Sequence, residues 1–253
     1  MKHSYRTLQH WNQWLAQDLM GEQLLAAEKE SLTVMLSQHF GKHALLIGVS
    51  NQYQLLKAST MPRQSLLSPL IHDERGLNYI EAELNELPLS SGSIDLVILP
   101  HTLEFIDNPR QLLAEACRVI KPEGLIVVCG FNPYSTWGVK KFFTKEENTA
   151  PWIGNFIQPG KIKKWLELAD FAMESQRSAL FSSLVAKPEW FKKFNFLETI
   201  SNKWGSVLGG TYIIAARAKV VPLTPIKMKW KQQFSGLRLP TAISGHIAGS
   251  SYK

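Results

Sequence analysis

The sequence predicts an α/β fold in which a mostly parallel sheet is covered by helices on both faces. Short, unbroken apolar runs such as 43–48 and 94–99 alternate along the chain with helical segments. A run that is apolar at every position is typical of a strand buried on both faces. Strands that alternate with helices favour parallel pairing through right-handed crossovers. We therefore expect a doubly wound sheet with a pocket at the carboxyl ends of its strands.

Composition and length support one large core. Hydrophobic residues make up 45% of the 253 residues and charged residues 19%, a balance that favours a globular chain over a disordered one. The length suits a single large domain with extensions. We divide the chain into an N-terminal helical extension at 1–40, an α/β domain at 41–218 and a basic, proline-containing tail at 219–253.

Two helices are expected before the first strand. Apolar residues recur at spacings of three, four and seven from residue 21 to Phe40, which is typical of an amphipathic helix. Trp11 and Trp14 lie three residues apart and indicate a shorter helix before it. Their rings either cover the mouth of a pocket or, as we favour, pack in the core or at an interface.

Seven segments are expected to be buried strands. They share a short length, apolar residues on both faces and a turn or helix between neighbours. The first ends at Gly48, and the segments span residues 43–48, 65–70, 77–82, 94–99, 125–129, 173–181 and 211–216.

The helix pattern is clearest at 108–120. Asp107 is the expected N-cap and Pro109 fits the first turn. The sequence Lys-Pro-Glu-Gly at 121–124 is expected to end this helix, and a further helix is expected at 160–169.

The positive charge lies at the end of the chain. The formal net charge is +7, yet residues 199–253 hold eight Lys or Arg and no acidic residue. The segment 219–253 also contains Pro222, Pro225 and Pro240 and has little apolar periodicity. We therefore expect an extended tail that allows weak contact with a polyanion.

Several classes of protein are disfavoured by the sequence. No apolar run reaches the roughly 18 residues of a spanning helix, and the first residues lack the apolar stretch of a signal peptide. We expect a cytoplasmic protein without a membrane span. Cys117 and Cys129 are expected to be buried thiols, neither a disulfide framework nor a zinc site. The seven histidines lack the spacing of a metal-ligand set, so no metal is expected.

Three linked motifs indicate a family. They read LPLSSGSIDLV at 87–97, HTLEF at 101–105 and RVIKPEG at 118–124. In these motifs the chain resembles the S-adenosylmethionine-dependent methyltransferases of the type 11 (UbiE-like) family, and the string CGFNPYS at 129–135 is similar to its YafS-like branch. The resemblance implies a Rossmann-like class I methyltransferase fold with seven strands, the last antiparallel, and S-adenosyl-L-methionine as the cofactor.

The resemblance places the glycine-rich cofactor turn of the family after the first strand. Gly48, Val49 and Ser50 are then expected beside the methionine part of the cofactor. Glycine at such a turn lets the backbone approach a ligand closely. The family pattern has an acid and two further glycines where this chain has Leu46, Ser50 and Gln52. We therefore expect weak cofactor binding.

The resemblance assigns the rest of the cofactor site to three other loops. The acid on the adenine side falls on Glu83, with Leu84 packing against the ring. Pro100 and His101, after the fourth strand, are expected to line the sulfonium end. Ser68 stands where the family has an acid for the ribose hydroxyls, and a serine hydroxyl makes such a bond without charge.

The acceptor side is assigned to the loop after the fifth strand. Asn132 and Tyr134 supply an amide and a phenol there, and we expect them to face the methyl acceptor. Methyl transfer depends mainly on the alignment of nucleophile and sulfonium, so the catalytic residues stay unassigned.

Structural roles compete with these assignments. Gly48 would serve equally to end a strand, and Glu83 would serve as a solvated loop acid. His101 is a candidate general base but also an ordinary loop histidine. Asp95, at the start of the fourth strand, is expected to hold backbone groups rather than a ligand.

Three functions therefore stay open. The first is a methyltransferase acting on an unidentified, small-molecule acceptor, which we favour because the central motifs are intact. The second is a catalytically inactive protein that keeps the fold for binding or scaffolding, indicated by the altered turn after the first strand. The third is an RNA-directed methyltransferase, indicated only by the basic tail. A fold alone does not decide between functions.

Overall fold

The apolar runs of the sequence assemble into one seven-stranded sheet, in the order β3-β2-β1-β4-β5-β7-β6. The computed structural model describes residues 2–70, 78–135, 137, 138, 141, 150–179 and 210–220. Only β7 runs antiparallel to its neighbours, which confirms the predicted mostly parallel sheet. The strands are β1 (His43–Ile47), β2 (Arg63–Ser68), β3 (Tyr79–Glu81), β4 (Ile94–Pro100), β5 (Ile120–Phe131), β6 (Phe171–Ala179) and β7 (Thr211–Ala218).

The order of the strands explains their composition. β1 lies between β2 and β4, so that Leu46 pairs with Leu66 on one side and Ile98 on the other. All three side chains are fully buried, because helices cover both faces of the sheet. The strand at 77–82 is shorter than predicted, and its first residue lies outside the described residues, as do positions 180 and 181 of the predicted sixth strand.

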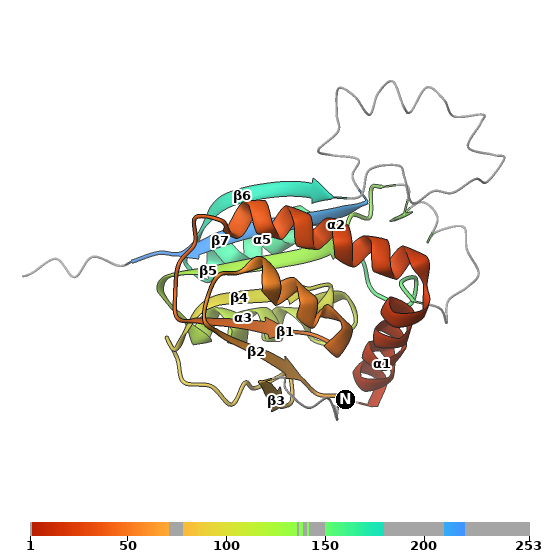
Figure 1. Cartoon of the computed structure of the whole chain (residues 1–253), viewed down its shortest axis with the longest axis horizontal. Helices are drawn as coiled ribbons and strands as arrows, with labels where there is room; N and C mark the ends of the chain where they lie inside the picture. Colours follow the sequence, from red (N-terminus) through yellow and green to blue (C-terminus); the bar gives the residue numbers. More distant parts are fainter. Residues whose placement is uncertain are drawn as a thin grey trace, which may run out of the picture. The chain divides into compact units, whose positions relative to one another are not determined.

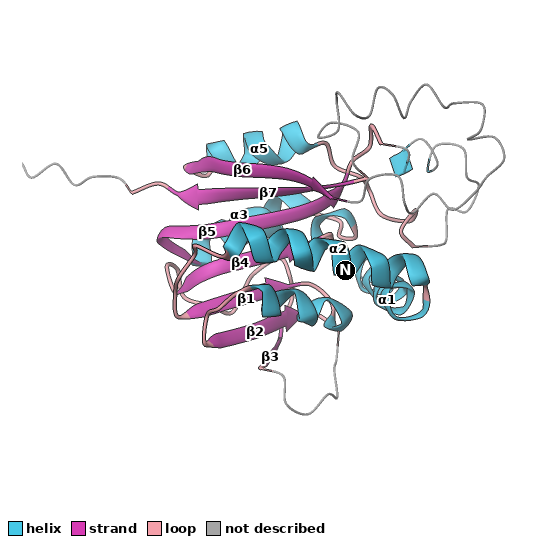
Figure 2. Cartoon of the chain, turned by 45° about the horizontal axis from the view of Figure 1, so that its top comes forward, coloured by secondary structure: helices cyan, strands magenta, loops and turns pink. Residues whose placement is uncertain are grey.

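The helices form a layer on each face of the sheet. Figure 1 draws α2 in front of the sheet, with α3 and α5 behind it, and Figure 2 shows the same two layers. The helical elements are α1 (Lys2–Gln17), α2 (Leu19–Leu36), the 3₁₀ segment η1 (Ser50–Ala58), η2 (Thr102–Glu104), α3 (Pro109–Val119) and α5 (Pro159–Leu168).

Three boundaries differ from the prediction. α2 ends at Leu36, and Phe40, which we expected on its buried stripe, is 81% exposed. The N-cap of α3 is Asn108, not Asp107, and its side chain makes no capping bond, so that Pro109 in the first turn carries the start of the helix. The helix ends before 121–124, as predicted, since α3 stops at Val119. The strand predicted at 125–129 begins earlier, because β5 starts at Ile120 and runs through 121–124 with Glu123 at a φ of 65°.

The two N-terminal helices share the core of the sheet. Residues 1–220 form one compact unit, and Leu8, Trp11 and Leu24 are fully buried in it. The core position that we favoured for Trp11 is therefore confirmed. Of the predicted tail at 219–253, residues 221–253 lie outside the described residues.

Candidate functional site

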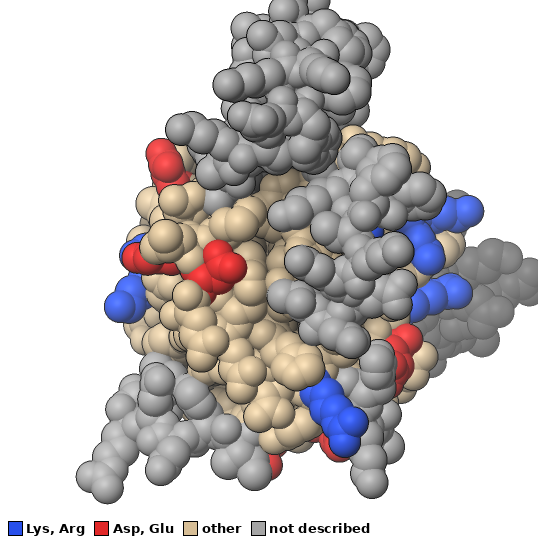
Figure 3. Space-filling model, turned by 90° about the vertical axis from the view of Figure 1, so that its right-hand side faces the viewer, with Lys and Arg blue, Asp and Glu red and all other residues tan. Residues whose placement is uncertain are grey.

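Helix α1 lies across the edge of the sheet to which β1, β4 and β5 point (Figure 1). A cavity of about 180 Å³ opens between this helix and the ends of β2 and β3. Figure 3 views this edge, where the visible described residues are mostly uncharged. In an open α/β sheet the carboxyl ends of the strands are where ligands bind. The cavity is lined by Tyr5, Gln9, Asn12, Gln13, Ser50, Leu66, Ser68, Leu70 and Tyr79.

Two of the predicted cofactor residues line this cavity. Ser50 follows β1 and Ser68 ends β2, so the pairing of these strands brings their hydroxyls to one side. Ser50 Oγ lies 3.2 Å from Asn12 Oδ1. Ser68 is buried, and its Oγ accepts a bond from the Leu70 amide at 3.3 Å. Both hydroxyls can still form a further hydrogen bond.

The turn after β1 is filled by a side chain of its own helix. Gln52 is fully buried, and its Oε1 accepts a bond from Val49 N at 3.0 Å. Its Nε2 donates to the carbonyl oxygen of Pro100 at 2.6 Å. A Cβ at Gly48 would collide with Gln52 Oε1, so the glycine at this position admits the glutamine. Gly48, Val49 and Pro100 thus lie together around a space that Gln52 occupies.

His101 lies in a left-handed turn after β4 and is completely buried. Its Nδ1 lies 2.9 Å from Glu104 Oε2, and its Nε2 lies 2.6 Å from Glu28 Oε1. Burial lowers the pKa of His101, but the two carboxylates outweigh it and raise that pKa to about 9. Burial raises the pKa of Glu104 despite the bond from the imidazole. With both ring nitrogens bonded to carboxylates, His101 holds its proton at neutral pH.

Nothing in the sequence pairs Glu28 with His101, because Glu28 lies in the middle of α2. Its side chain is fully buried, and Oε2 has no hydrogen-bond partner among the described residues. Glu104 also contacts β5, because its Oε1 accepts a hydrogen bond from Phe131 N at 2.7 Å. The Glu28–His101–Glu104 cluster therefore connects α2 to the ends of β4 and β5.

Aromatic rings close this cluster from the side of α1. The ring centroid of Trp11 lies 4.6 Å from that of Phe105 and 5.3 Å from that of Trp14. Phe131 meets Trp11 edge-on at 5.9 Å. Trp11 is fully buried, and its Nε1 has no partner among the described residues. The ring is thus a packed part of the core that also covers the ends of β4 and β5.

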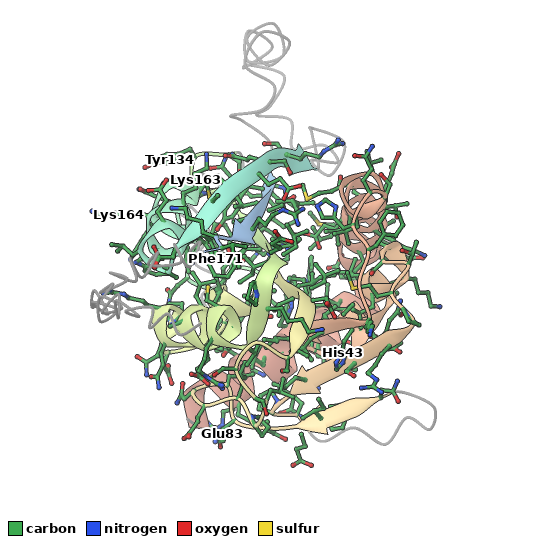
Figure 4. The ribbon with its side chains drawn as sticks, turned by 90° about the vertical axis from the view of Figure 1, so that its left-hand side faces the viewer. His43, Glu83, Tyr134, Lys163, Lys164 and Phe171 are labelled. Carbon is green, nitrogen blue, oxygen red and sulfur yellow. The ribbon has the colours of Figure 1, made fainter. Side chains whose placement is uncertain are left out.

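Glu83 and Leu84 follow β3, beyond the cavity. Glu83 is exposed and Leu84 is buried. Figure 4 labels Glu83 at the β3 end of the molecule and Tyr134 at the opposite end. Neither Glu83 nor Leu84 lines the cavity.

Asn132 and Tyr134 lie in the turn after β5. Asn132 Oδ1 accepts a bond from Tyr134 N at 3.0 Å, and its carbonyl oxygen accepts one from Ser135 Oγ at 2.6 Å. The Asn132 side chain therefore shapes this turn. Tyr134 is 61% exposed, and its hydroxyl accepts a bond from Gln158 Nε2.

Asp95 has the structural role expected of it. Its carboxylate accepts bonds from the amides of Lys42 and His43 and pairs with Lys121 at 2.8 Å. Cys117 and Cys129 are free thiols; Cys129 is buried, as predicted, whereas Cys117 is only partly buried. In the described part of the chain, no group of three His, Cys, Asp or Glu side chains is arranged to hold a metal ion. None of the described helices is both long and apolar enough to cross a lipid bilayer.

The residues that sequence reasoning missed come from α1. Tyr5, Gln9, Asn12 and Gln13 all line the cavity, although they were read only as part of a helical extension. Their spacing of four, seven and eight residues was a visible signal, because it places them on one face of a helix.

Comparison with known sequences gives a family match that covers the cavity residues of β2, β3 and the turn after β1 but not those of α1. Residues 31–128 match the family model described as "Methyltransferase domain", which confirms the resemblance expected from the sequence motifs. The Escherichia coli (strain K12) protein YafS is 31% identical over 150 residues, covering 59% of each chain. The ubiquinone/menaquinone biosynthesis C-methyltransferase UbiE of Campylobacter jejuni (strain RM1221) is 25% identical over 126 residues, covering 45% of this chain. The chain thus spans between half and two thirds of these relatives, 59% and 53% of their lengths.

Solved structures share the fold. An S-adenosylmethionine-dependent methyltransferase from Thermotoga maritima superposes with a TM-score of 0.60 at 19% identity, over 85% of this chain and 97% of that one. With the strand order and the antiparallel β7, this likeness confirms the fold prediction: the chain has the Rossmann-like class I methyltransferase fold.

Proposed function

We propose that this chain is an S-adenosylmethionine-dependent methyltransferase of the type 11 family, which acts on a small-molecule acceptor. The fold and the matched methyltransferase domain support the proposal. The observation that carries it is the cavity at the ends of β1, β2 and β3, because this is the edge at which a doubly wound sheet binds its ligand.

The residues that line the cavity fit the ribose part of the cofactor, while the residues we assign to the adenine follow β3 outside the lining. The cavity offers the hydroxyls of Ser50 and Ser68, and we assign the adenine end to Glu83 and Leu84. The volume of about 180 Å³ is below that of ordinary ligand pockets, which hold roughly 300–1,000 Å³. The cavity is therefore sized for part of the cofactor.

The methionine half fits only when Gln52 moves. Its amide occupies the space beside Gly48 and is bonded to Val49 and Pro100. Rotation of this side chain would free Val49 N and the Pro100 carbonyl, a donor and an acceptor for the amino-acid end of the cofactor. Losing the two bonds opposes binding, which agrees with the weak affinity expected from the sequence.

The chemistry then depends on alignment. When bound, the cofactor would supply a sulfonium methyl group for transfer to a lone pair of the acceptor, with S-adenosylhomocysteine as the leaving group. His101 holds its proton between Glu28 and Glu104 and in this arrangement accepts none. Asn132 and Tyr134, at the end of β5, are the residues we assign to positioning the acceptor.

Titration calorimetry with S-adenosylmethionine and S-adenosylhomocysteine tests the proposal. A dissociation constant below about 100 μM is expected for at least one of them, corresponding to roughly 5.5 kcal/mol. Absence of both heat and a thermal shift at millimolar ligand would contradict it, because a ligand that binds only the folded state must stabilise that state.

A second candidate is favoured by the position of Gln52. A side chain that fills the methionine half suits a catalytically inactive binding or scaffold protein as well as a methyltransferase. The two candidates separate in the calorimetry, since the inactive protein binds neither methionine-containing ligand.

Two expectations from the sequence stay part of the proposal. Weak polyanion contact, and with it an RNA-directed activity, rests on the charge of the tail at 219–253, most of which lies outside the described residues. RNA affinity that does not fall with rising salt would exclude that contact. The cytoplasmic location expected from the sequence likewise stays a proposal.

A further inference from the structure

One face of α1 is polar and points into the cavity. Tyr5, Gln9, Asn12 and Gln13 lie four, seven and eight residues apart and line it together. Leu8, Trp11 and Leu15 form the other face, and all are buried in the core. The helix thus has a packing face and a separate polar face toward the cavity.

Hydrogen bonds fix the polar face in position. Asn12 Oδ1 accepts bonds from Ser50 Oγ and Asn51 N at 3.2 Å and from Asn51 Nδ2 at 2.8 Å. On the neighbouring turn, Thr7 Oγ1 donates to the carbonyl oxygen of Phe105 at 2.7 Å. These bonds tie α1 to the segments that follow β1 and β4, so the helix is a fixed wall of the cavity.

Gln9 and Gln13 are the two glutamines of this wall, and their side-chain amides are available to a ligand. Within the described part of the chain their side-chain amides make no hydrogen bond, so each offers a donor and an acceptor to a ligand. The facing wall supplies the Ser68 hydroxyl together with the apolar surfaces of Leu66 and Leu70.

The lining defines the chemistry of the ligand group. None of the described residues that line the cavity carries a charge, so these residues offer no counter-charge to a phosphate or carboxylate group. Amides and hydroxyls bind neutral groups that both donate and accept, such as ribose hydroxyls and the nitrogen atoms of a base. Leucine side chains suit the flat apolar face of the base.

We propose that Gln9 and Gln13 of α1 bind the nucleoside half of the ligand, as neutral substitutes for a carboxylate that the end of β2 lacks. The inference deepens the proposed function and rests on it for the identity of the complete ligand. It makes the N-terminal helix a specificity-determining part of the site.

Binding of adenosine and of S-adenosylhomocysteine to the full chain, measured by calorimetry, tests the inference. Gln9→Ala and Gln13→Ala should each weaken binding of both ligands roughly tenfold, the loss of one well-formed hydrogen bond. Gln23→Ala is the matched control, since Gln23 is an exposed glutamine on α2 outside the cavity lining. Because all three glutamines are exposed, melting temperatures should stay unchanged.

The outcomes separate the inference from the proposed function. Unchanged affinity of the Gln9 and Gln13 variants for S-adenosylhomocysteine would overturn the inference and leave the methyltransferase proposal standing. Binding of adenosine that depends on both glutamines, without any binding of the methionine-containing ligands, would support the inference and contradict the proposed function. Binding of neither ligand to the unaltered chain would overturn both.

Discussion

The side-chain amide of Gln52 lies 2.6 Å from the carbonyl oxygen of Pro100 and ties the turn after β1 to the end of β4. These two segments meet because β1 and β4 are neighbours in the sheet. In the type 11 family pattern the position of Gln52 is a glycine, which would leave the space open. Glutamine in place of glycine at position 52 therefore fills the space in which the methionine half of the cofactor is expected.

Replacing Gln52 by Ala should tighten the binding of S-adenosylhomocysteine while lowering stability. The variant empties the space beside Gly48 but leaves Val49 N and the Pro100 carbonyl unbonded. Two lost partners in a buried position should cost about 1–3 kcal/mol of unfolding free energy. Calorimetry and urea unfolding measure the two effects. Gln54 lies on an exposed side of the same segment, so Gln54→Ala should change neither the affinity nor the stability. Weaker binding of S-adenosylhomocysteine by the Gln52→Ala variant would show that the Gln52 side chain does not block the cofactor.

Trp11 should tolerate Phe far better than Ala. Its ring packs on Phe105 and Trp14 in a fully buried position, so Trp11→Ala should cost about 3–5 kcal/mol. Trp11→Phe keeps most of the ring contact and removes an indole N–H that has no partner among the described residues, so its cost should stay below about 1.5 kcal/mol. Chemical denaturation gives both values. Equal losses for the two variants would show that the indole nitrogen is bonded in solution.

Stability should fall as pH rises through about 9, the raised pKa of His101. An unfolded histidine has a pKa of about 6.5, so the charged imidazole stabilises the fold fully below that pH and loses this effect through the folded pKa. The contribution is about 3 kcal/mol, an order-of-magnitude value for this buried cluster. Glu28→Gln removes one carboxylate, which lowers the pKa of His101 and should move the loss to lower pH. Parallel pH profiles of Tm for the variant and the unaltered chain would exclude His101 as the titrating group.

The sheet was predictable because burial on both faces leaves a signal at every position of a strand. The runs before Gly48 and at β4 fell within a residue or two of their structural bounds. The end of the α2 helix was not predictable, since Phe40 continues the apolar spacing but is exposed. Periodicity describes one face of a helix and does not show which of its last residues reaches the core.

The site was only partly predictable, because its contacts join distant segments. Ser50 and Ser68 were placed from the family pattern, and both line the cavity. Glu28 gave no signal, since an acid in the middle of a helix is ordinarily solvated, and only the fold brings it to His101. Gln52 was recognised as a departure from the family pattern. Only the structure shows that its side chain forms hydrogen bonds to both Val49 and Pro100, which lie in two different loops.

Gly130 and Gly160 should respond to alanine with opposite signs. Gly130 pairs with Tyr212 across β5 and β7, and a Cβ there would collide with the phenol ring of Tyr212. That ring is buried, and its hydroxyl donates to the carbonyl oxygen of Ile157 at 3.0 Å, so it has little freedom to move. Gly130→Ala should therefore cost about 1–3 kcal/mol by overpacking. Gly160 lies in the first turn of α5 with nothing within 4 Å of a Cβ, so Gly160→Ala should stabilise by about 0.4–1 kcal/mol through lower entropy of the unfolded chain. Urea unfolding of both variants measures the two free energies, and a Gly130→Ala protein as stable as the unaltered chain would show that Tyr212 is not fixed against β5.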